Sequence, residues 1–196
     1  MLGRPYPTAT ETKTFAPLIR PAQKQPVSLS FMNLVEAHVL RALRTEHGVS
    51  VDALRRALRY AEAEMEIDRL LLRQDLLTHA GGVLLKRYGQ LIDLSASGQL
   101  AMQRVLEQHL KRVEWAPDKL PVRLYPFVSA DGVTPGRDVA IDPNVAFGRP
   151  ILRRAGVSTG VIAARLDAGE SVESLAEDYD LTAAEIEQAA VYERAA

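Results

Sequence analysis

The segment from residue 158 to residue 193 contains three helical patterns joined by very short turns. We expect three helices, over Thr159–Asp167, Ser171–Tyr179 and Thr182–Glu193. Ser171 can cap the second helix, and Thr182 with Glu185 forms a capping box for the third. Because turns this short leave neighbouring helices no room to separate, the segment must fold as a compact unit of three helices.

A run of turn-forming residues over 129–138 divides the chain by charge. Residues 1–136 hold 18 Lys+Arg and 14 Asp+Glu, a net charge of +4, whereas residues 137–196 hold 6 and 11, a net charge of −5. The total of −1 therefore hides a mildly basic part joined to an acidic one. The sequence predicts an N-terminal domain over 1–128, a linker over 129–136 and a C-terminal domain over 137–196.

The N-terminal part has the outline of a helix-turn-helix. The first helix is predicted to begin at Asn33, with Asn33 and Glu36 forming a cap, and to end at Gly48. A second helix is predicted after Ser50, with apolar residues on one face as far as Met65. Helix, glycine-containing turn and helix is the order typical of that motif.

Strands are expected around these helices. Residues 83–87 and 90–94 predict a β-hairpin, and 122–127 and 139–141 predict short strands. Residues 1–28 contain five prolines and are expected to be extended, with a short strand near 15–19. A third long helix is predicted over 99–113, before Pro117. The expected fold is mainly α with small β content. It has a winged, helical N-terminal domain with a hairpin and a tri-helical, helix-turn-helix-like C-terminal domain.

The composition argues against catalysis. With no cysteine, the chain has no thiol nucleophile and no cysteine-ligated zinc. Its four histidines lack metal-ligand spacing, His109 fits a core position, and no phosphate-binding loop or nucleophile elbow occurs. We therefore expect no enzyme activity, cofactor or metal. No apolar run approaches the ~20 residues of a membrane span, and no signal peptide is present, which predicts a cytoplasmic protein that does not contact a membrane.

Basic residues of the second helix are candidates for DNA binding. Arg55, Arg56 and Arg59 lie opposite its apolar stripe, where they could face a DNA groove or phosphates. The alternative is a solvated face with local pairs, such as Arg59 with Glu62. Lys86 and Arg87, in the predicted hairpin, are candidates for a wing that contacts phosphates, with a solvated surface as the alternative.

The last helix carries acidic residues on its outward face, among them Glu185, Glu187 and Glu193. A DNA duplex repels such a face. We therefore expect the C-terminal unit to meet a basic protein partner or a second copy of the chain.

The C-terminal domain carries a recognisable pattern. Val139–Leu152 contains Gly-Arg-Pro, Ala168–Tyr179 contains Ala-Gly-Glu-Ser and Glu-Asp-Tyr, and Thr182–Ala190 follows. These stretches, which span about 137–194, resemble the bacterial domain of unknown function 433. After Gly-Arg-Pro this family commonly has a Gly-Thr-type turn and a proline. This chain has Arg153 and Arg154 there, which can reach a partner.

The N-terminal domain resembles the DNA-binding domain that accompanies this family in VapB-like antitoxins. The similarity lies in Leu29–Leu40, Leu91–Ser95 and Val113–Trp115. Residues 48–56 resemble the second helical pair of MerR-like regulators. In those proteins the reader helix lies further upstream, before a wing similar to residues 3–7. This comparison predicts either a truncated start or a DNA contact that has been lost or moved.

The resemblance implies the antitoxin of a type II, VapBC-like toxin–antitoxin pair. Such a protein binds and neutralises a PIN-like ribonuclease toxin and regulates its operon by binding operator DNA, as a homodimer or larger complex with the toxin. The candidate toxin contacts are Phe147, Arg149, Arg153, Arg154 and Arg165. Since PIN-like nucleases use an acidic, metal-binding active site, an arginine could occupy it as a charge mimic. The alternative is that the acidic helices cover a basic RNA-binding rim.

Two other functions remain open. One is a stand-alone MerR-like DNA-binding transcription regulator that never meets a toxin. The other is a structural dimerisation module. A short PIN-like reading frame beside this gene would favour the antitoxin.

Overall fold

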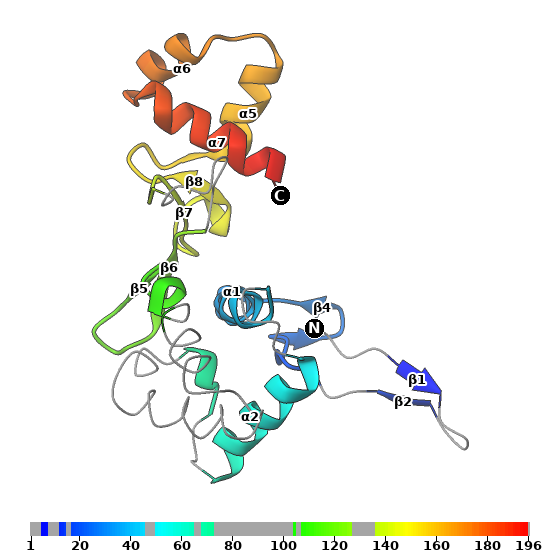
Figure 1. The fold of residues 1–196 in the computed structure, drawn as a ribbon. Helices are drawn as coiled ribbons and strands as arrows, with labels where there is room; N and C mark the ends of the chain where they lie inside the picture. Colours follow the sequence, from blue (N-terminus) through cyan, green and yellow to red (C-terminus); the bar gives the residue numbers. More distant parts are fainter. Residues whose placement is uncertain are drawn as a thin grey trace. The chain divides into compact units, whose positions relative to one another are not determined.

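The computed structural model describes residues 5–7, 12–14, 17–45, 50–64, 68–72, 104, 107–126 and 136–195. The chain divides into two compact units (Figure 1). The N-terminal unit comprises Met1–Lys111 and Trp115–Pro121, and the C-terminal unit comprises Arg112–Glu114 and Val122–Ala196. The hairpin predicted over 83–94 and all but the last residue of the predicted linker lie outside the described residues.

Three helices end the C-terminal unit, and all three were predicted. They are α5 (Thr159–Asp167), α6 (Val172–Tyr179) and α7 (Ala183–Ala195). The caps are also confirmed. The Ser174 N–H donates to Ser171 Oγ at 3.1 Å, while the backbone N–H groups of Glu185 and Thr182 bond each other's side chains at 3.3 and 2.8 Å. Capping chemistry places the starts of α6 and α7, whereas Ser158, which precedes α5, forms no side-chain cap bond.

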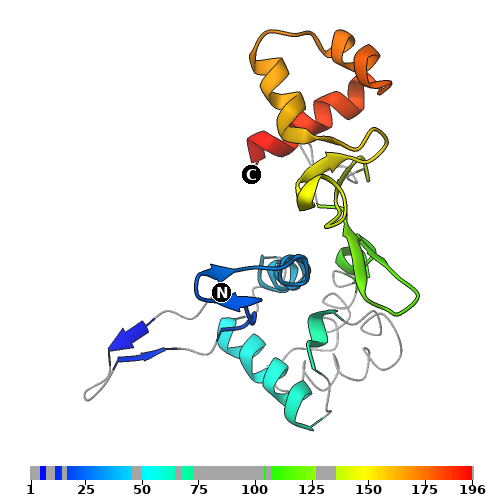
Figure 2. The same cartoon turned by 180° about the vertical axis from the view of Figure 1, so that it is seen from behind.

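A five-stranded sheet accompanies the helices, seen from behind in Figure 2. Its strands, in spatial order, are β5 (Val113–Trp115), β6 (Pro121–Leu124), β7 (Val139–Ile141), β8 (Pro150–Leu152) and β9 (Val157–Ser158). Neighbouring strands from β6 to β9 pair antiparallel. The predictions near 122–127 and 139–141 are confirmed, but β5, β8 and β9 were missed. The division into units also differs from the predicted boundary at 128, because β6 pairs with β7.

The helix predicted over 99–113 extends too far. Residues 107–110 are helical, but Val113 lies in β5 and Pro117 lies in the turn between β5 and β6. The valine fits an apolar position in a strand as well as in a helix, so periodicity alone could not separate the two.

The sheet separates two apolar clusters. Val139 and Leu152 face the cluster formed with α5, α6 and α7. The next residues along the strands, Ala140 and Ile151, belong to a cluster with Tyr125. Because side chains alternate along a strand, the pairing of Ala140 with Ile151 fixes both faces at once.

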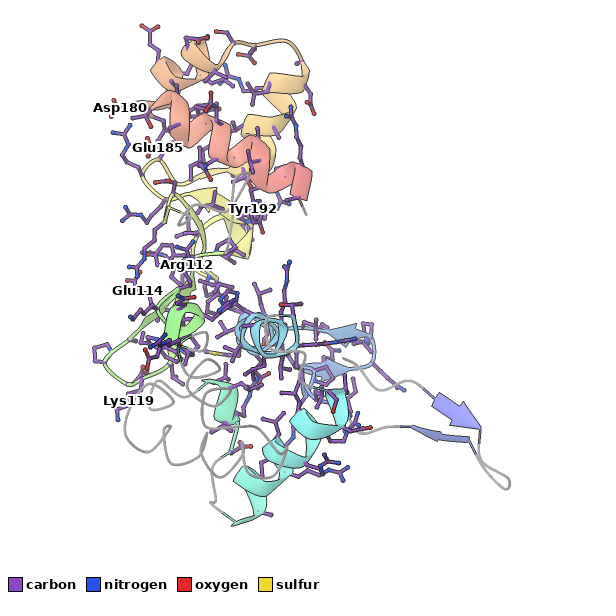
Figure 3. The ribbon with its side chains drawn as sticks, viewed as in Figure 1. Arg112, Glu114, Lys119, Asp180, Glu185 and Tyr192 are labelled. Carbon is purple, nitrogen blue, oxygen red and sulfur yellow. The ribbon has the colours of Figure 1, made fainter. Side chains whose placement is uncertain are left out.

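A buried arginine joins two segments of the C-terminal unit. Arg112 donates to the carbonyls of Tyr125 at 3.0 Å, of Pro126 at 3.0 Å and of Gly136 at 2.8 Å (Figure 3). Burial, and then the charge of Arg137, hold the pKa of Arg112 below its usual range. These bonds hold together the two segments that immediately precede and follow residues 127–135.

The N-terminal unit contains α1 (Phe31–Thr45), α2 (Val51–Glu64) and the 3₁₀ turn η1 (Leu70–Leu72). Two small hairpins precede them, β1 (Pro5–Pro7) with β2 (Thr12–Thr14) and β3 (Gln23–Lys24) with β4 (Val27–Ser28). The described residues near 15–19 form no strand. None of the described helices combines the length and apolar content that crossing a bilayer requires.

Asn33 holds the start of α1 by a buried network rather than by a cap. The helix begins at Phe31, and Ser30 caps it, since its Oγ accepts from the Asn33 N–H at 3.3 Å. The Asn33 side chain accepts from the N–H groups of Ala22 and Ser30 at 3.1 Å. It donates to the Arg20 carbonyl at 2.7 Å and to Glu36 at 3.0 Å. The predicted cap at Asn33 is therefore wrong, because the capping residue is Ser30, about one helical turn earlier.

We predict that Asn33→Ala lowers the free energy of unfolding by about 2–4 kcal/mol, because it leaves several backbone groups around α1 without a partner. Urea denaturation followed by circular dichroism measures this loss. Leu34→Ala, at an exposed position of the same helix, controls for the truncation and should cost less than about 1 kcal/mol. Equal losses for the two variants would contradict the assigned role of Asn33.

Candidate functional site

A short loop between β7 and β8 carries the most exposed aromatic residue among the described residues. The turn η3 (Ala146–Gly148) is held by backbone hydrogen bonds, from Gly148 N to Val145 O at 3.0 Å and from Arg149 N to Ala146 O at 3.1 Å. Val145 and Ala146 pack against the Tyr125 cluster. The loop is thus anchored to the sheet, while Phe147 is 99% exposed.

The backbone of this loop is strained. Ala146, Phe147 and Gly148 have successive φ angles of 48°, 57° and 76°. The left-handed conformation costs a residue other than glycine about 1–2 kcal/mol. Leaving a phenyl ring in water forgoes a further stabilisation of about 1.5–3 kcal/mol. Two unfavourable features at one residue of a well-anchored loop point to a binding role.

Two predicted arginines near this loop are available to a partner. Arg149 and Arg153 lie at the two ends of β8, and both are exposed. Neither forms an ion pair with another described residue. Their guanidinium groups can therefore bind carboxylates of another molecule without breaking an internal pair.

The other two predicted arginines are engaged within the unit. Arg165 binds Glu170 at 2.7 Å and Asp178 at 2.6 Å, and it stacks on the Tyr179 ring at 5.3 Å. The bond to Glu170 raises the pKa of Arg165, and the same bond lowers the pKa of Glu170. Arg154 lies 3.4 Å from Glu185 and donates to the Asp180 carbonyl.

Acidic groups beside the loop are also engaged. Asp142 is buried and accepts from Arg123 Nη2 at 2.8 Å, and its Oδ1 accepts from the Asn144 N–H at 2.9 Å. Glu114 accepts from the Tyr125 hydroxyl at 2.6 Å and from Arg123 at 3.1 Å. Hydrogen bonds to Tyr125 and Asp142 raise the pKa of Arg123. Phe147 and Arg149 thus form an apolar and cationic surface, which we call the Phe147 loop.

A second, acidic surface lies on the helices of the same unit. Glu173 and Glu177 on α6 and Glu187 on α7 are exposed. Glu185 points elsewhere, because it completes the cap of α7. Burial opposes its ionisation, but the hydrogen bonds from Thr182 and the charges of Arg154 and Arg153 together lower its pKa.

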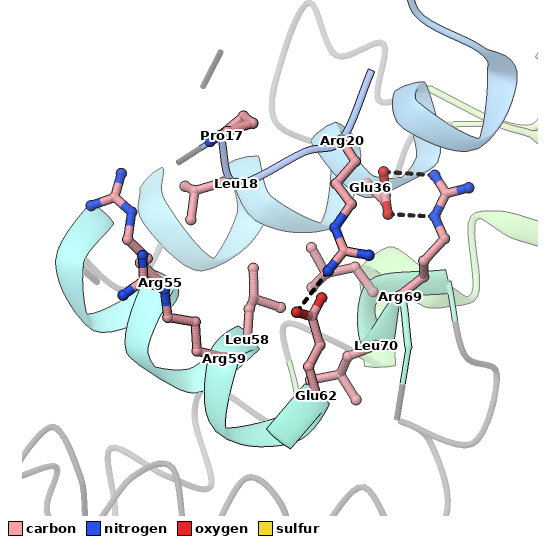
Figure 4. Close-up of a pocket in the computed structure, with 11 residues that line it drawn as sticks. Pro17, Leu18, Arg20, Glu36, Arg55, Leu58, Arg59, Glu62, Arg69 and Leu70 are labelled. Atoms are coloured by element: carbon pink, nitrogen blue, oxygen red, sulfur yellow. Dashed lines mark hydrogen bonds and ion pairs between the residues drawn. The ribbon is translucent and has the colours of Figure 1, made fainter. Parts of the chain in front are cut away.

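The candidate DNA contacts lie on α2. Arg56 and Arg59 are exposed, and Arg55 Nη1 donates to Asp52 at 2.7 Å. The local pair suggested between Arg59 and Glu62 does not form, because Glu62 binds Arg20 at 2.8 Å (Figure 4). Lys86 and Arg87 lie outside the described residues. In the described part of the chain, no group of three or more His, Cys, Asp or Glu residues could hold a metal ion.

Sequence reasoning named Phe147 but not the reason for its exposure. The signal was a phenylalanine between Ala146 and Gly148 in a loop that follows Asp-Pro-Asn. Only the φ angles and the packing of Val145 show that the ring is held outward.

Comparisons with known proteins agree with the C-terminal resemblance. Residues 139–192 match the family described as "Protein of unknown function (DUF433)". Over 169 residues the chain is 28% identical to "Putative antitoxin VapB45" of Mycobacterium tuberculosis. This match covers 79% of the chain but only 66% of the length of that relative. The crystal structure of Rv2018 from Mycobacterium tuberculosis has a similar fold, with a TM-score of 0.68 and 24% identity over 88% of this chain and 85% of that one.

We predict that Phe147→Asn stabilises the C-terminal unit by about 1 kcal/mol, because asparagine tolerates positive φ better than phenylalanine. Hydrogen exchange of the β7 and β8 amides measures this gain. Val161→Asn, at an exposed apolar position of the same unit without positive φ, should give no gain. If Phe147→Asn does not slow hydrogen exchange of these amides, the backbone at Phe147 is not strained.

The ion pair of Arg165 with Glu170 should make stability depend on pH. Since the folded pKa of Glu170 is lowered, the pair stabilises above the unfolded value of about 4.3 and is lost as pH falls through the folded value. Arg165→Gln should therefore lower the melting temperature at pH 7 but have a smaller effect near pH 3. Arg194→Gln, at an exposed position of α7, controls for the lost charge. An effect of Arg165→Gln that does not change with pH would contradict this assignment.

Proposed function

We propose that this protein is an antitoxin that binds and neutralises a PIN-like ribonuclease toxin, and that the Phe147 loop is the centre of the contact. The antitoxin assignment is supported by the similarity of the chain to the mycobacterial relative and of residues 139–192 to the family. Neutralisation by contact requires no catalysis, so the protein acts as a regulator without a cofactor.

The exposure and strain of Phe147 carry the proposal. An aromatic side chain presented on a rigid loop is typical of the anchors that dominate protein interfaces. Insertion into an apolar pocket removes the ring from water. The hydrophobic stabilisation that is absent in the free protein is then gained on binding. Because the loop is already held in shape by the sheet, little conformational entropy is lost on binding.

The neighbouring arginines supply the charge. A PIN-like active site is acidic, so Arg149 and Arg153 can form bidentate hydrogen bonds with its carboxylates. Arg165 and Arg154 contribute less, since binding would first have to break their contacts with Glu170, Asp178 and Glu185. We therefore propose Phe147, Arg149 and Arg153 as the main contacts among the five candidate residues.

The acidic surface offers a second way to bind the same toxin. Glu173 and Glu177 could cover a basic RNA-binding rim, as the charge of the C-terminal unit suggested. The two binding modes predict that different charge-reversal variants lose toxin binding. Arg149→Glu with Arg153→Glu should abolish binding if the arginines occupy the active site. Glu173→Lys with Glu177→Lys should do so if the helices cover the rim.

We also propose that α2 contacts operator DNA. Arg55, Arg56 and Arg59 place three positive charges on one helix of the N-terminal unit, and a homodimer would present two such helices to DNA. The same observation favours the alternative, a DNA-binding regulator without a toxin. A short PIN-like reading frame beside the gene favours the antitoxin.

Co-expression with the neighbouring PIN-like gene tests the main proposal. Wild-type protein should restore growth and elute with the toxin in size-exclusion chromatography. Phe147→Asn should weaken toxin binding at least about 30-fold, as expected for an interface anchor worth 2 kcal/mol or more. Arg194→Glu provides the matched control and should retain binding. A toxin that stays active beside the wild-type protein would refute the proposal.

A further inference from the structure

A carboxylate at the start of the Phe147 loop binds both the loop and the neighbouring strand. Asp142 directly follows β7, and its side chain is only 9% exposed. Its Oδ1 accepts from the Asn144 N–H at 2.9 Å, and its carbonyl accepts from the Val145 N–H at 3.1 Å. Its Oδ2 accepts from Arg123 of β6, from Nη2 at 2.8 Å and from Nε at 3.2 Å. The ion pair with Arg123 therefore fixes the group that shapes the first turn of the loop.

Tyr125 supports the same turn by apolar contact. The ring is buried, and Val145 and Ala146 pack against its cluster. The Tyr125 hydroxyl donates to Glu114 Oε2 at 2.6 Å, and Arg123 Nη1 donates to the same oxygen at 3.1 Å. Glu114 consequently joins the polar contact of the loop to its apolar contact.

These contacts connect three neighbouring strands. Glu114 lies on β5 (Figure 3), Arg123 lies on β6, and Asp142 lies at the end of β7. Solvent screens a pair that includes so buried a carboxylate less than it screens a surface pair. Removal of one partner leaves the other charge without compensation, which costs more than replacement of both partners by neutral groups.

The loop requires this support because its own backbone is strained. Ala146, Phe147 and Gly148 all have positive φ, and the phenyl ring is left in water. Such conformations persist only where the surrounding structure fixes them. Without the contacts of Asp142 the turn can relax, and Phe147 is then presented in other directions.

We infer that Arg123, Asp142 and Glu114 are positioning residues, which hold the Phe147 loop in the conformation that binds the partner. For the partner, a PIN-like toxin, the inference rests on the proposed function, whereas the order of the loop is a property of the free protein. Loss of the network lowers the fraction of molecules that can bind, and the association rate falls with it. The bound complex keeps the contacts of Phe147 and Arg149, so its dissociation rate changes little.

Hydrogen exchange of the Asn144 and Val145 amides in the full chain tests the order of the loop without a partner. Arg123→Gln and Asp142→Asn each leave one charge unpaired and should accelerate exchange at least about tenfold. The double variant replaces the ion pair by two neutral amides, which can bond each other. It should return the exchange rate to within about threefold of wild type.

Two further variants make this measurement specific. Tyr125→Phe removes only the hydroxyl bond to Glu114 and keeps the ring in the core, so it should fold and accelerate exchange about threefold. Arg165→Gln removes an ion pair of α5 with α6 and controls for a general loss of stability. It should leave the exchange of both loop amides unchanged. Circular dichroism confirms that each variant is folded.

Binding kinetics with the toxin from the neighbouring PIN-like gene separate positioning from contact. In surface plasmon resonance, Arg123→Gln should lower the association rate constant at least about fivefold and change the dissociation rate constant less than about twofold. Phe147→Asn should instead raise the dissociation rate constant, because it removes a contact of the complex.

Unchanged exchange in Arg123→Gln, Asp142→Asn and Tyr125→Phe would overturn the inference. So would a double variant that does not recover, an equal acceleration in Arg165→Gln, or an effect of Arg123→Gln that lies wholly in dissociation. A wild-type protein that does not bind the toxin refutes the proposed function alone. The exchange rates then still decide whether the three residues position the loop.

Discussion

The pairing of β7 with β8 is the contact on which the C-terminal unit depends. It places Val139 and Leu152 against the three helices and Ala140 and Ile151 on the opposite face. A slip of one residue would exchange the two faces and expose both clusters. The same pairing closes the loop between the strands, so the sheet determines where Phe147 is presented. The candidate site is in this sense a product of strand register.

Internal ion pairs decide which arginines can act on other molecules. In the C-terminal unit, Arg165 is held by two carboxylates, while Arg149 has no such pair among the described residues. In the N-terminal unit, Arg20 binds Glu62 and Arg69 binds Glu36. A count of basic residues could not make this distinction, because a charge that already has a buried or bidentate partner costs free energy to release. The near-neutral total charge therefore gives no measure of which arginines are engaged within the protein.

The parts of the fold that could be predicted are those determined by local interactions. The helices α6 and α7 follow from caps between residues three positions apart, and α5 follows from its apolar spacing and the short turn after it. The start of α1 was misplaced, because Asn33 has the side chain of a capping residue but serves a buried network instead. The helix before β5 was extended too far, since Val113 suits either structure. Both errors concern residues whose role is set by distant parts of the chain.

The sequence by itself determined the three-helix segment, the opposite charges of the N-terminal and C-terminal parts of the chain, and the absence of thiol chemistry. It also determined the resemblance of residues 137–194 to the domain of unknown function 433. Tertiary structure alone decided that Phe147 stands out from a strained turn and that Arg165 is engaged. It also decided that Arg123 of β6 meets Asp142 at the start of the Phe147 loop. The physical reason is distance along the chain. Caps and turns act between neighbours, whereas exposure and ion pairing depend on segments that only folding brings together.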